Sequence, residues 1–313
     1  MRSEFVAALA HLAQQDERIV FLTGDLGYGV VGPLFEQVPE RTFNVGVAEQ
    51  NMVAMATGLA EAGLIPFVYS IATFSVLRPF EFIRNGPVLH QLPVRVIGVG
   101  GGMEYANNGP SHFALEDVGV MRTQPGVQIY CPNDTSTALR ILADTYTSPG
   151  PVYYRLSKQT TPDVAGLADV APFDVAAGAQ VLASGDGRVA VLALGPMAGE
   201  LGRIADSLAA DGIDATTVAV WGVSPAPTGL LARLASQHDI VVTVESHYSV
   251  GGLGSLVADV IAETGAAGRL VRCAVEQAPI GVVGTQHDLA RWARIDHDSV
   301  VDRIRAEVAR GRP

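Results

Sequence analysis

The 313-residue chain carries a formal net charge of −11, from 21 basic and 32 acidic side chains, and it contains no run of basic residues. This balance argues against a nucleic acid or an anionic membrane as a partner. Apolar residues make up 48% and charged residues only 17%, so the length and composition predict about two domains with a large core and a buried subunit interface.

The N-terminal segment and the cysteines bear on the compartment. The apolar run 5–13 follows Arg2 in the manner of a secretory signal, but His11 interrupts it and a charged stretch follows, so we expect an amphipathic helix. No stretch approaches the roughly 18–20 apolar residues that cross a bilayer. Cys131 and Cys273 are far apart, which predicts neither a disulfide framework nor a cysteine metal site. A reducing cytoplasm is the expected location.

The first half of the chain alternates between buried strands and helices. Strands are expected at 18–23, 41–45, 65–69, 94–99, 128–132 and 152–156, and helices at 5–13, 52–62, 76–90, 115–122 and 134–146, the last capped by Asp134. Strands that are apolar almost throughout are typical of a parallel sheet covered on both faces. The pattern therefore predicts a doubly wound α/β domain over residues 1–157.

The second half repeats the alternation on a smaller scale. Residues 158–175, with Gln, Thr, Pro and Gly, predict a linker. Strands are then expected at 189–194, 215–220, 240–245 and 269–275, with helices beginning near 199 and 253. Crossover connections between such elements predict a second, smaller doubly wound α/β domain over residues 176–313.

Two carboxylates stand where strands of the first domain end. Glu49 lies between the strand at 41–45 and the helix at 52–62, and Asp25 lies in the Gly-rich turn after the strand at 18–23. In open α/β sheets, ligands bind at this edge. An acidic residue in the first turn of a helix or in a turn is nevertheless often only a cap. Position alone therefore favours a capping role for both.

For Asp25 the capping role stays the commoner one, but sequence motifs reverse the preference for Glu49. They are Gly46-Val47-Ala48-Glu49-Gln50-Asn51, Tyr69-Ser70-Ile71-Ala72-Thr73-Phe74, Arg78-Pro79-Phe80-Glu81 and Asn108-Gly109-Pro110-Ser111-His112. Together they resemble the signatures of the transketolase family, including its relatives that make deoxyxylulose phosphate. The resemblance covers nearly the whole chain, but only as the C-terminal half of a full-length transketolase. The chain looks like the pyrimidine-binding subunit of a split, two-subunit enzyme that uses thiamine diphosphate.

The resemblance implies roles for individual residues. Glu49 would contact N1′ of the cofactor's aminopyrimidine ring, in an apolar pocket formed by Phe74, Leu77 and Phe80. Asp25 would also line the cofactor site. A buried, dry carboxyl at Glu49 is suited to holding a proton at N1′. His112 would face the reacting carbons and move protons on the substrate's hydroxyl or carbonyl oxygens.

The substrate side departs from ordinary transketolases. Asn108 stands where they have an Asp that reads the donor's C2 hydroxyl, and Gly100 stands where they have a His that helps to hold sugar phosphate. Arg155 and Lys158 remain as candidate phosphate ligands, with solvated or structural roles at least as common. The residues expected at the substrate are therefore His112, Asn108 and Arg155, and the identity of the small sugar substrate stays open.

The ligands for the diphosphate end of the cofactor are not recognisable. Thiamine enzymes hold the Mg²⁺ of the diphosphate with a Gly-Asp-Gly motif and an Asn roughly thirty residues later. Here Gly185-Asp186-Gly187 precedes a strand as a plain turn would, and no Asn follows Asn133. We therefore expect no metal ligand in this chain. An N-terminal-type partner subunit would hold Mg²⁺, in an assembly of two copies of each chain (α2β2).

The predicted function is transfer of a two-carbon ketol unit from a ketose to an aldose, with activity only in the presence of the partner. One alternative is the β-subunit of a 2-oxoacid dehydrogenase or an enzyme like deoxyxylulose-phosphate synthase, which shares the architecture and the Glu. The Gly-Pro-Ser-His loop favours a transketolase over the dehydrogenase. An alternative of another class is a non-catalytic regulatory or scaffold paralogue, and the intact Glu49 speaks against it.

Overall fold

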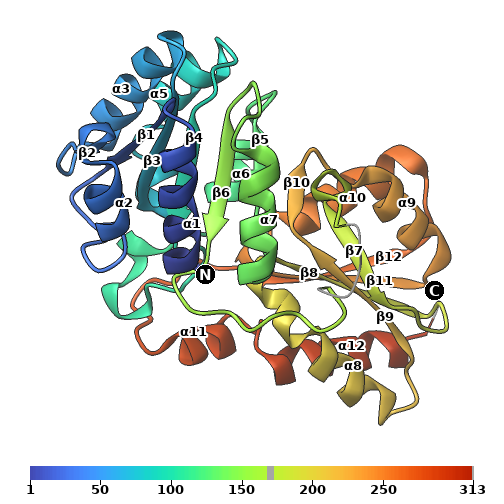
Figure 1. The fold of residues 1–313 in the computed structure, drawn as a ribbon. Helices are drawn as coiled ribbons and strands as arrows, with labels where there is room; N and C mark the ends of the chain where they lie inside the picture. The colour runs from blue at the N-terminus through green and yellow to red at the C-terminus, as the bar shows by residue number, and fades with distance from the viewer. Residues whose placement is uncertain (168–172, 312–313) are drawn as a thin grey trace.

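Two mostly parallel sheets, one in each half of the chain, organise the computed structural model, which describes residues 1–167 and 173–311 (Figure 1). The two α/β units confirm the predicted fold class. The predicted domain bounds stay predictions, and residues 168–172 of the predicted linker lie outside the described residues. Within the described residues, no helix is long and apolar enough to span a membrane.

The first sheet has seven strands in the order β10-β5-β6-β4-β3-β1-β2. Its strands are β1 (Ile19–Thr23), β2 (Thr42–Asn44), β3 (Ile65–Ile71), β4 (Arg95–Val99), β5 (Gln128–Tyr130), β6 (Val152–Leu156) and β10 (Gly222–Ser224). All neighbours run parallel except β10, which pairs antiparallel with β5. The second half of the chain thus supplies an edge strand to the first sheet.

Helices cover both faces of this sheet because successive strand residues point to opposite sides. One face packs against α1 (Arg2–Gln15), α2 (Gly32–Gln37) and α7 (Thr135–Thr145). The other packs against α3 (Glu49–Glu61), α5 (Phe80–Ile83) and α6 (Asp117–Arg122). In β1, for example, Phe21 belongs to the first cluster and Leu22 to the second.

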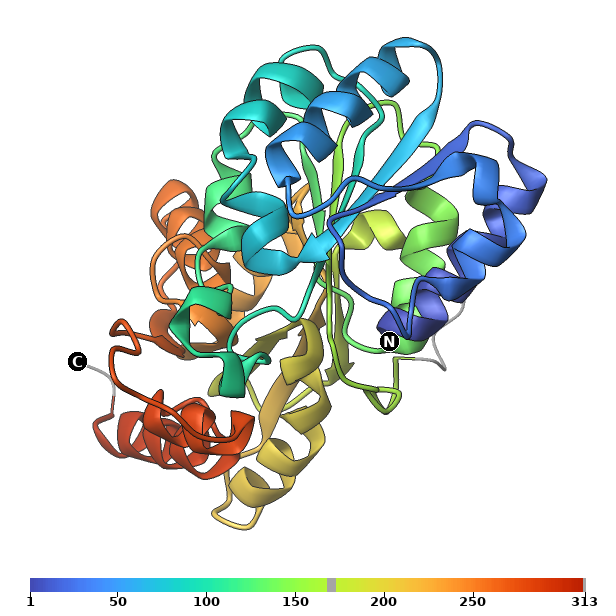
Figure 2. The ribbon, with the colours of Figure 1, turned by 90° about the vertical axis from the view of Figure 1, so that its left-hand side faces the viewer.

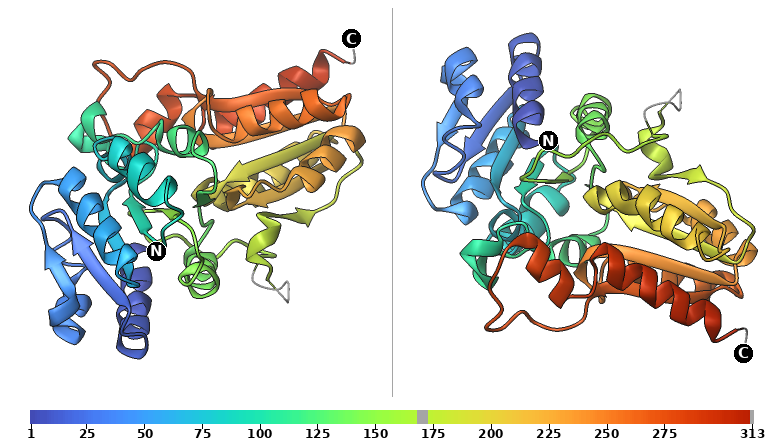
Figure 3. Two further views of the ribbon diagram at one scale, coloured as in Figure 1. Left: turned by 90° about the horizontal axis from the view of Figure 1, so that it is seen from above. Right: turned by 90° about the horizontal axis from the view of Figure 1, so that it is seen from below.

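The second sheet has five strands in the order β12-β11-β8-β9-β7, with β7 antiparallel at the edge. Its strands are β7 (Ala179–Ala183), β8 (Val189–Leu194), β9 (Ala215–Val220), β11 (Ile240–Tyr248) and β12 (Arg269–Val275). Its helices are α8 (Leu201–Ala209), α9 (Thr228–Gln237), α10 (Leu253–Thr264), α11 (Gln286–Trp292) and α12 (His297–Ala309). Figure 3 shows α12 on one face of this sheet and α10 on the other.

The helix predicted at 76–90 is wrong as a single element. The structure has α4 (Ala72–Val76), then α5, then a π-helical turn at Arg84–Val88. Pro79 lies between α4 and α5, and a proline has no N–H to continue the helical ladder. The predicted cap of α7 is confirmed, because the Asp134 side chain accepts a hydrogen bond from the Thr137 N–H at 2.7 Å.

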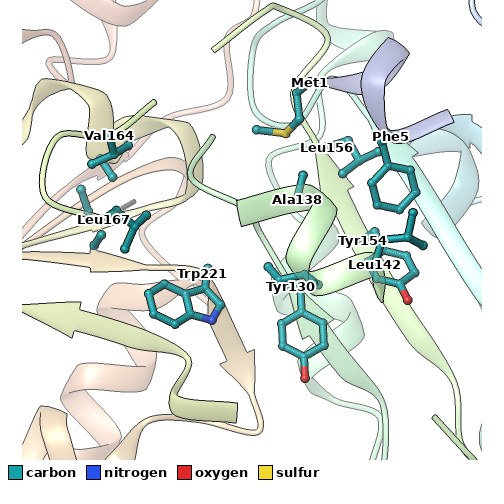
Figure 4. Packing of buried hydrophobic residues seen from close by; sticks show 14 of the residues in the cluster. Met1, Phe5, Tyr130, Ala138, Leu142, Tyr154, Leu156, Val164, Leu167 and Trp221 are labelled. Atoms are coloured by element: carbon teal, nitrogen blue, oxygen red, sulfur yellow. The ribbon is translucent and has the colours of Figure 1, made fainter. Parts of the chain in front are cut away.

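The two units share a continuous core. Phe5 of α1 packs on Tyr154 of β6 with ring centroids 5.4 Å apart, and Trp221, next to β10, belongs to the same buried cluster (Figure 4). The buried Asn133 side chain donates to the backbone carbonyls of Gly195 and Val220 in the second unit. A smaller cluster joins the loop after β4 to α11, and Figure 2 shows these segments side by side.

Candidate active site

The predicted site residues lie in loops that follow the carboxyl ends of the central parallel strands, at one edge of the first sheet. Thr23, the last residue of β1, pairs with Asn44 at the end of β2 and with Tyr69 in β3. Val99 at the end of β4 pairs with Leu156 at the end of β6. The loops that begin after these residues therefore start side by side, which is where open α/β sheets bind ligands.

Glu49 is the first residue of α3, and only 1% of its surface is exposed. The turn before it needs Gly46, whose φ of 76° lies in the left-handed region that favours glycine. The Glu49 carboxylate has two polar partners. Ser70 Oγ donates to Oε1 at 3.1 Å, and Arg78 Nη1 lies 3.0 Å from Oε1 and 2.9 Å from Oε2. The expectation of purely apolar surroundings was therefore incomplete, because a cation reaches the carboxylate.

Arg78 is the site residue that the sequence reasoning missed. Its guanidinium carbon lies 3.7 Å from the centroid of the Phe74 ring, and 39% of its side chain is exposed. Phe74 is in α4, and Arg78 follows it by four residues. That spacing places two side chains on the same face of a helical segment, and it is the signal that would have found the contact.

His112 extends this group on its other side. It ends a 3₁₀ turn at Pro110–His112, and its ring meets the Phe74 ring edge-on, with centroids 5.1 Å apart. Its Nδ1 lies 3.0 Å from Ser111 Oγ. The structure thus brings together Glu49, Phe74 and His112, three residues predicted from motifs that are far apart in the sequence.

The aromatic ring of Tyr105 packs directly against Gly100. Gly100 has a φ of 76°, and a methyl group there would fall 2.1 Å from the Tyr105 ring. The Tyr105 ring lies 6.2 Å from the His112 ring, and Lys158 Nζ lies 4.5 Å from the Tyr105 centroid. Burial raises the pKa of the Tyr105 hydroxyl. The sequence reasoning identified Gly100 but not the aromatic side chain that packs against it.

Asp25 joins two of the loops at this edge. It is exposed and accepts hydrogen bonds from Tyr28 Oη at 2.5 Å and Asn44 Nδ2 at 2.8 Å, which hold its pKa below the usual value. Asn44 Oδ1 in turn accepts from the Gly46 N–H. Asp25 therefore supports the turn that presents Glu49, and its predicted contact with the cofactor stays a prediction.

The remaining predicted residues lie at the rim. Leu77 is exposed at the C-terminal end of α4, and Phe80 is half-buried at the start of α5. Asn108 is exposed in a 3₁₀ turn at Ala106–Asn108, within the loop that ends in His112. Their roles toward the cofactor and the substrate stay predictions.

Arg155 is engaged elsewhere. It is buried and forms an ion pair with Asp117, with Nε 2.8 Å from Oδ2 and Nη2 3.1 Å from Oδ1. Nη2 also donates to the carbonyls of Ala114 and Ser246. These bonds hold the loop after β4 against the second unit, so we drop Arg155 from the candidate substrate ligands. The geometry gives it the structural role that the sequence left open.

The residues present fit the aminopyrimidine half of thiamine diphosphate. Glu49 offers a buried acceptor, and Phe74 offers an aromatic face beside it. Gly185-Asp186-Gly187 is confirmed as a turn before β8, in which Asp186 accepts from the N–H and Nε of Arg188. Across residues 1–167 and 173–311, no group of three or more His, Cys, Asp or Glu side chains is placed to hold a metal ion.

Comparisons with known proteins identify the family to which the chain is similar. Residues 1–163 match the transketolase pyrimidine-binding domain, and residues 177–300 match the transketolase C-terminal domain. A Methanocaldococcus jannaschii protein described as a transketolase C-terminal section is 32% identical, over 98% of this chain and 96% of that one. One of the subunits of an apulose-4-phosphate transketolase from Actinobacillus succinogenes is 32% identical, over 87% and 86%. A 6-deoxy-6-sulfo-D-fructose transketolase subunit of Clostridium sp. (strain MSTE9) is 34% identical, over 84% and 81%.

A solved structure and a longer relative show which part of a transketolase-like enzyme this chain resembles. A split gene transketolase, described as an inactive beta4 tetramer, is 33% identical with a TM-score of 0.87, covering 97% of both chains. The 1-deoxy-D-xylulose-5-phosphate synthase 2 of Geobacter sulfurreducens is 31% identical over 98% of this chain but only 49% of its own length. The chain therefore belongs to the transketolase family, of which it carries the pyrimidine-binding and C-terminal domains.

Proposed function

We propose that the chain is one subunit of a thiamine diphosphate-dependent transketolase, which moves a two-carbon ketol unit from a ketose to an aldose. The observation that carries this proposal is the buried Glu49 at the first turn of α3, linked through Arg78 to Phe74, on which His112 packs. Relatives that match most of the chain are named as transketolase subunits, which supports the same reading.

The bound cofactor would supply a centre that stabilises an acyl carbanion equivalent. Glu49 would hold a proton at N1′ of the aminopyrimidine, and its burial keeps water from weakening that hydrogen bond. Phe74 would orient the ring by stacking, with Leu77, Phe80 and Asp25 around it. His112 would move protons on substrate oxygens, since its ring lies against Phe74 and its loop opens at the strand ends.

A partner subunit would supply the Mg²⁺ and diphosphate ligands, in an α2β2 assembly. Two observations support this division. Asp186, in the one Gly-Asp-Gly sequence, is bonded to Arg188 in a turn. Relatives that this chain covers over most of their length are named as a transketolase subunit and as a split gene transketolase. The buried free thiols of Cys131 and Cys273 suit a reducing cytoplasm.

The substrate is proposed to be a small sugar with an anionic group. Two relatives are named for apulose 4-phosphate and for 6-deoxy-6-sulfo-D-fructose, both of which are anionic sugars. Lys158, whose ammonium lies 4.5 Å from the Tyr105 ring centroid, supplies a cation near His112. Asn108 would contact the substrate from the same loop as His112.

The test is reconstitution with the diphosphate-binding subunit, thiamine diphosphate and Mg²⁺. We expect transfer of a ketol unit from anionic ketoses to aldoses, detected as the new ketose by mass spectrometry. Acylation of a lipoyl domain from a 2-oxoacid would instead assign the chain to a dehydrogenase. A complex that binds the cofactor but turns over no ketose, 2-oxoacid or pyruvate–aldehyde pair would assign it to a regulatory role.

A further inference from the structure

One planar cation lies between Glu49 and Phe74, the two side chains to which the proposed function assigns the cofactor ring. Arg78 Nη1 reaches both oxygens of Glu49, at 3.0 and 2.9 Å, while the guanidinium carbon lies 3.7 Å from the Phe74 centroid. A guanidinium is flat and carries N–H donors, so it stacks on an aromatic face and binds a carboxylate at its edge. An aminopyrimidine ring that donates to Glu49 and stacks on Phe74 has the same requirements.

We propose that Arg78 is an internal ligand of the cofactor pocket: in the free chain its guanidinium takes the place of the aminopyrimidine ring, and the ring binds only after Arg78 has turned away. This inference rests on the proposed function for the identity of the cofactor. The 3.7 Å between Phe74 and the guanidinium is a single stacking distance, so both groups do not fit over the same ring face.

The contacts of Arg78 allow such an exchange. Within the described ranges its polar and ring partners are Glu49 and Phe74, and 39% of its side chain already faces solvent. Glu49 is 2% exposed at its side chain and keeps the Ser70 hydroxyl in either state. With Ser70 alone, the buried carboxylate would have one neutral donor and no counter-charge, which is costly, so Arg78 pairs with it until the cofactor binds.

The ring binds only those molecules in which Arg78 has left the pocket. The apparent association constant for the cofactor is therefore the intrinsic constant multiplied by the fraction of such molecules. An open fraction of about a tenth or less weakens the apparent affinity about tenfold or more. Removing the guanidinium therefore improves binding of the ring. If Arg78 were instead a ligand of the cofactor, removing it would weaken binding, so the two roles predict opposite signs.

The experiment uses the isolated full chain and 4-amino-5-hydroxymethyl-2-methylpyrimidine, which carries the ring of the cofactor without its diphosphate. Calorimetric titration should give a dissociation constant about tenfold or more lower for Arg78→Ala than for the wild type. Arg78→Met should behave like Arg78→Ala, because it keeps the aliphatic length without the cation. The matched control is Arg84→Ala, an exposed arginine in the next helical turn, which should bind like the wild type.

A second readout follows Arg78 itself. In the wild type its Nε–Hε NMR signal, identified by its loss in Arg78→Lys, should become that of a mobile, solvated guanidinium when the pyrimidine saturates the chain. Equal or weaker binding by Arg78→Ala, an equal gain in Arg84→Ala, or an unchanged Arg78 signal at saturation would overturn the inference. Binding by no folded variant would overturn the proposed cofactor pocket as well. Binding that is lost in Glu49→Gln but not improved in Arg78→Ala would overturn the internal ligand alone.

Discussion

At the scale of single residues, the sequence motifs pointed to Glu49, Phe74 and His112 as site residues. They did not predict the cation that pairs with the Glu49 carboxylate. Glu49 and Phe74 share the partner Arg78, and His112 packs on Phe74, because the strand ends bring their loops to one edge. Arg78 and Tyr105 were missed because most of their contacts, such as those of Arg78 with Glu49 and of Tyr105 with Gly100, are set by the packing of loops that are far apart in the sequence. Only the four-residue spacing between Phe74 and Arg78 pointed to one of their contacts.

Glu49→Gln should lower turnover of the reconstituted enzyme at least about 100-fold, because the amide cannot act as the acid at N1′. Circular dichroism should report an unchanged fold, since the amide has nearly the same volume and can still accept from Ser70 and Arg78. The measurement is the ketol-transfer rate at saturating cofactor. Activity above about a tenth of the wild-type rate would contradict the role of the carboxyl group.

His112→Ala should slow the reaction about 10²-fold or more while leaving the affinity for thiamine diphosphate nearly unchanged. His112 contacts Phe74 at the edge of its ring, whereas Arg78 lies over the face. Titration of the cofactor into the variant complex and single-turnover rates separate the two effects. A large loss of cofactor affinity, with full turnover at saturation, would remove His112 from the substrate side.

At the scale of elements, apolar runs predicted the long central strands, and turn residues predicted most of their ends. The helix at 76–90 failed at Pro79, where the missing N–H interrupts the ladder. The short edge strands β7 and β10 were not predicted. β10 has three residues, and its partner β5 lies about ninety positions earlier in the sequence. No local periodicity therefore predicts that these two strands pair.

A buried ion pair of the first unit positions a side chain that also bonds the second unit, because Arg155 pairs with Asp117 and donates to the Ser246 carbonyl. Burial opposes the charge of Asp117, but the charge of Arg155 and the hydrogen bonds from Arg155 and Tyr153 outweigh it and lower the pKa of the carboxyl. Asp117→Asn should destabilise the fold by about 3–5 kcal/mol at neutral pH, because it leaves the Arg155 charge buried and unpaired. Urea unfolding followed by tryptophan fluorescence measures the change.

The same pair has a defined pH dependence. Since the folded pKa of Asp117 is lowered, its stabilisation is present above the unfolded value of about 3.9 and is lost as the pH falls through the folded pKa. The difference between wild type and Asp117→Asn should therefore shrink below about pH 4. Asp259→Asn, at a carboxylate 63% exposed and 3.4 Å from Arg122, is the control and should change stability little. A gap that is constant with pH would contradict the ion pair.

At the scale of the whole molecule, most of the exposed large apolar side chains among the described residues belong to the first unit. They include Phe43, Val47, Met55, Phe82 and Leu89. Exposed apolar surface is common at subunit interfaces. We expect the chain to self-associate at micromolar concentration through this unit, and Met55→Glu to weaken the association. Sedimentation velocity measures it, with Ile280→Glu in the second unit as the control; equal effects of both changes would contradict the assignment.

We expect the cofactor site to be divided between two chains. Alone, the chain should bind thiamine diphosphate with a dissociation constant near or above about 1 mM, or roughly −4 kcal/mol, because it supplies only the pyrimidine half of the pocket. The Mg²⁺-diphosphate end needs oxygen ligands in fixed geometry, which we assign to the partner. Adding that partner should produce Mg²⁺-dependent binding and ketol transfer together. Calorimetry with and without the partner decides the point, since micromolar, Mg²⁺-dependent binding by the isolated chain would contradict a divided site.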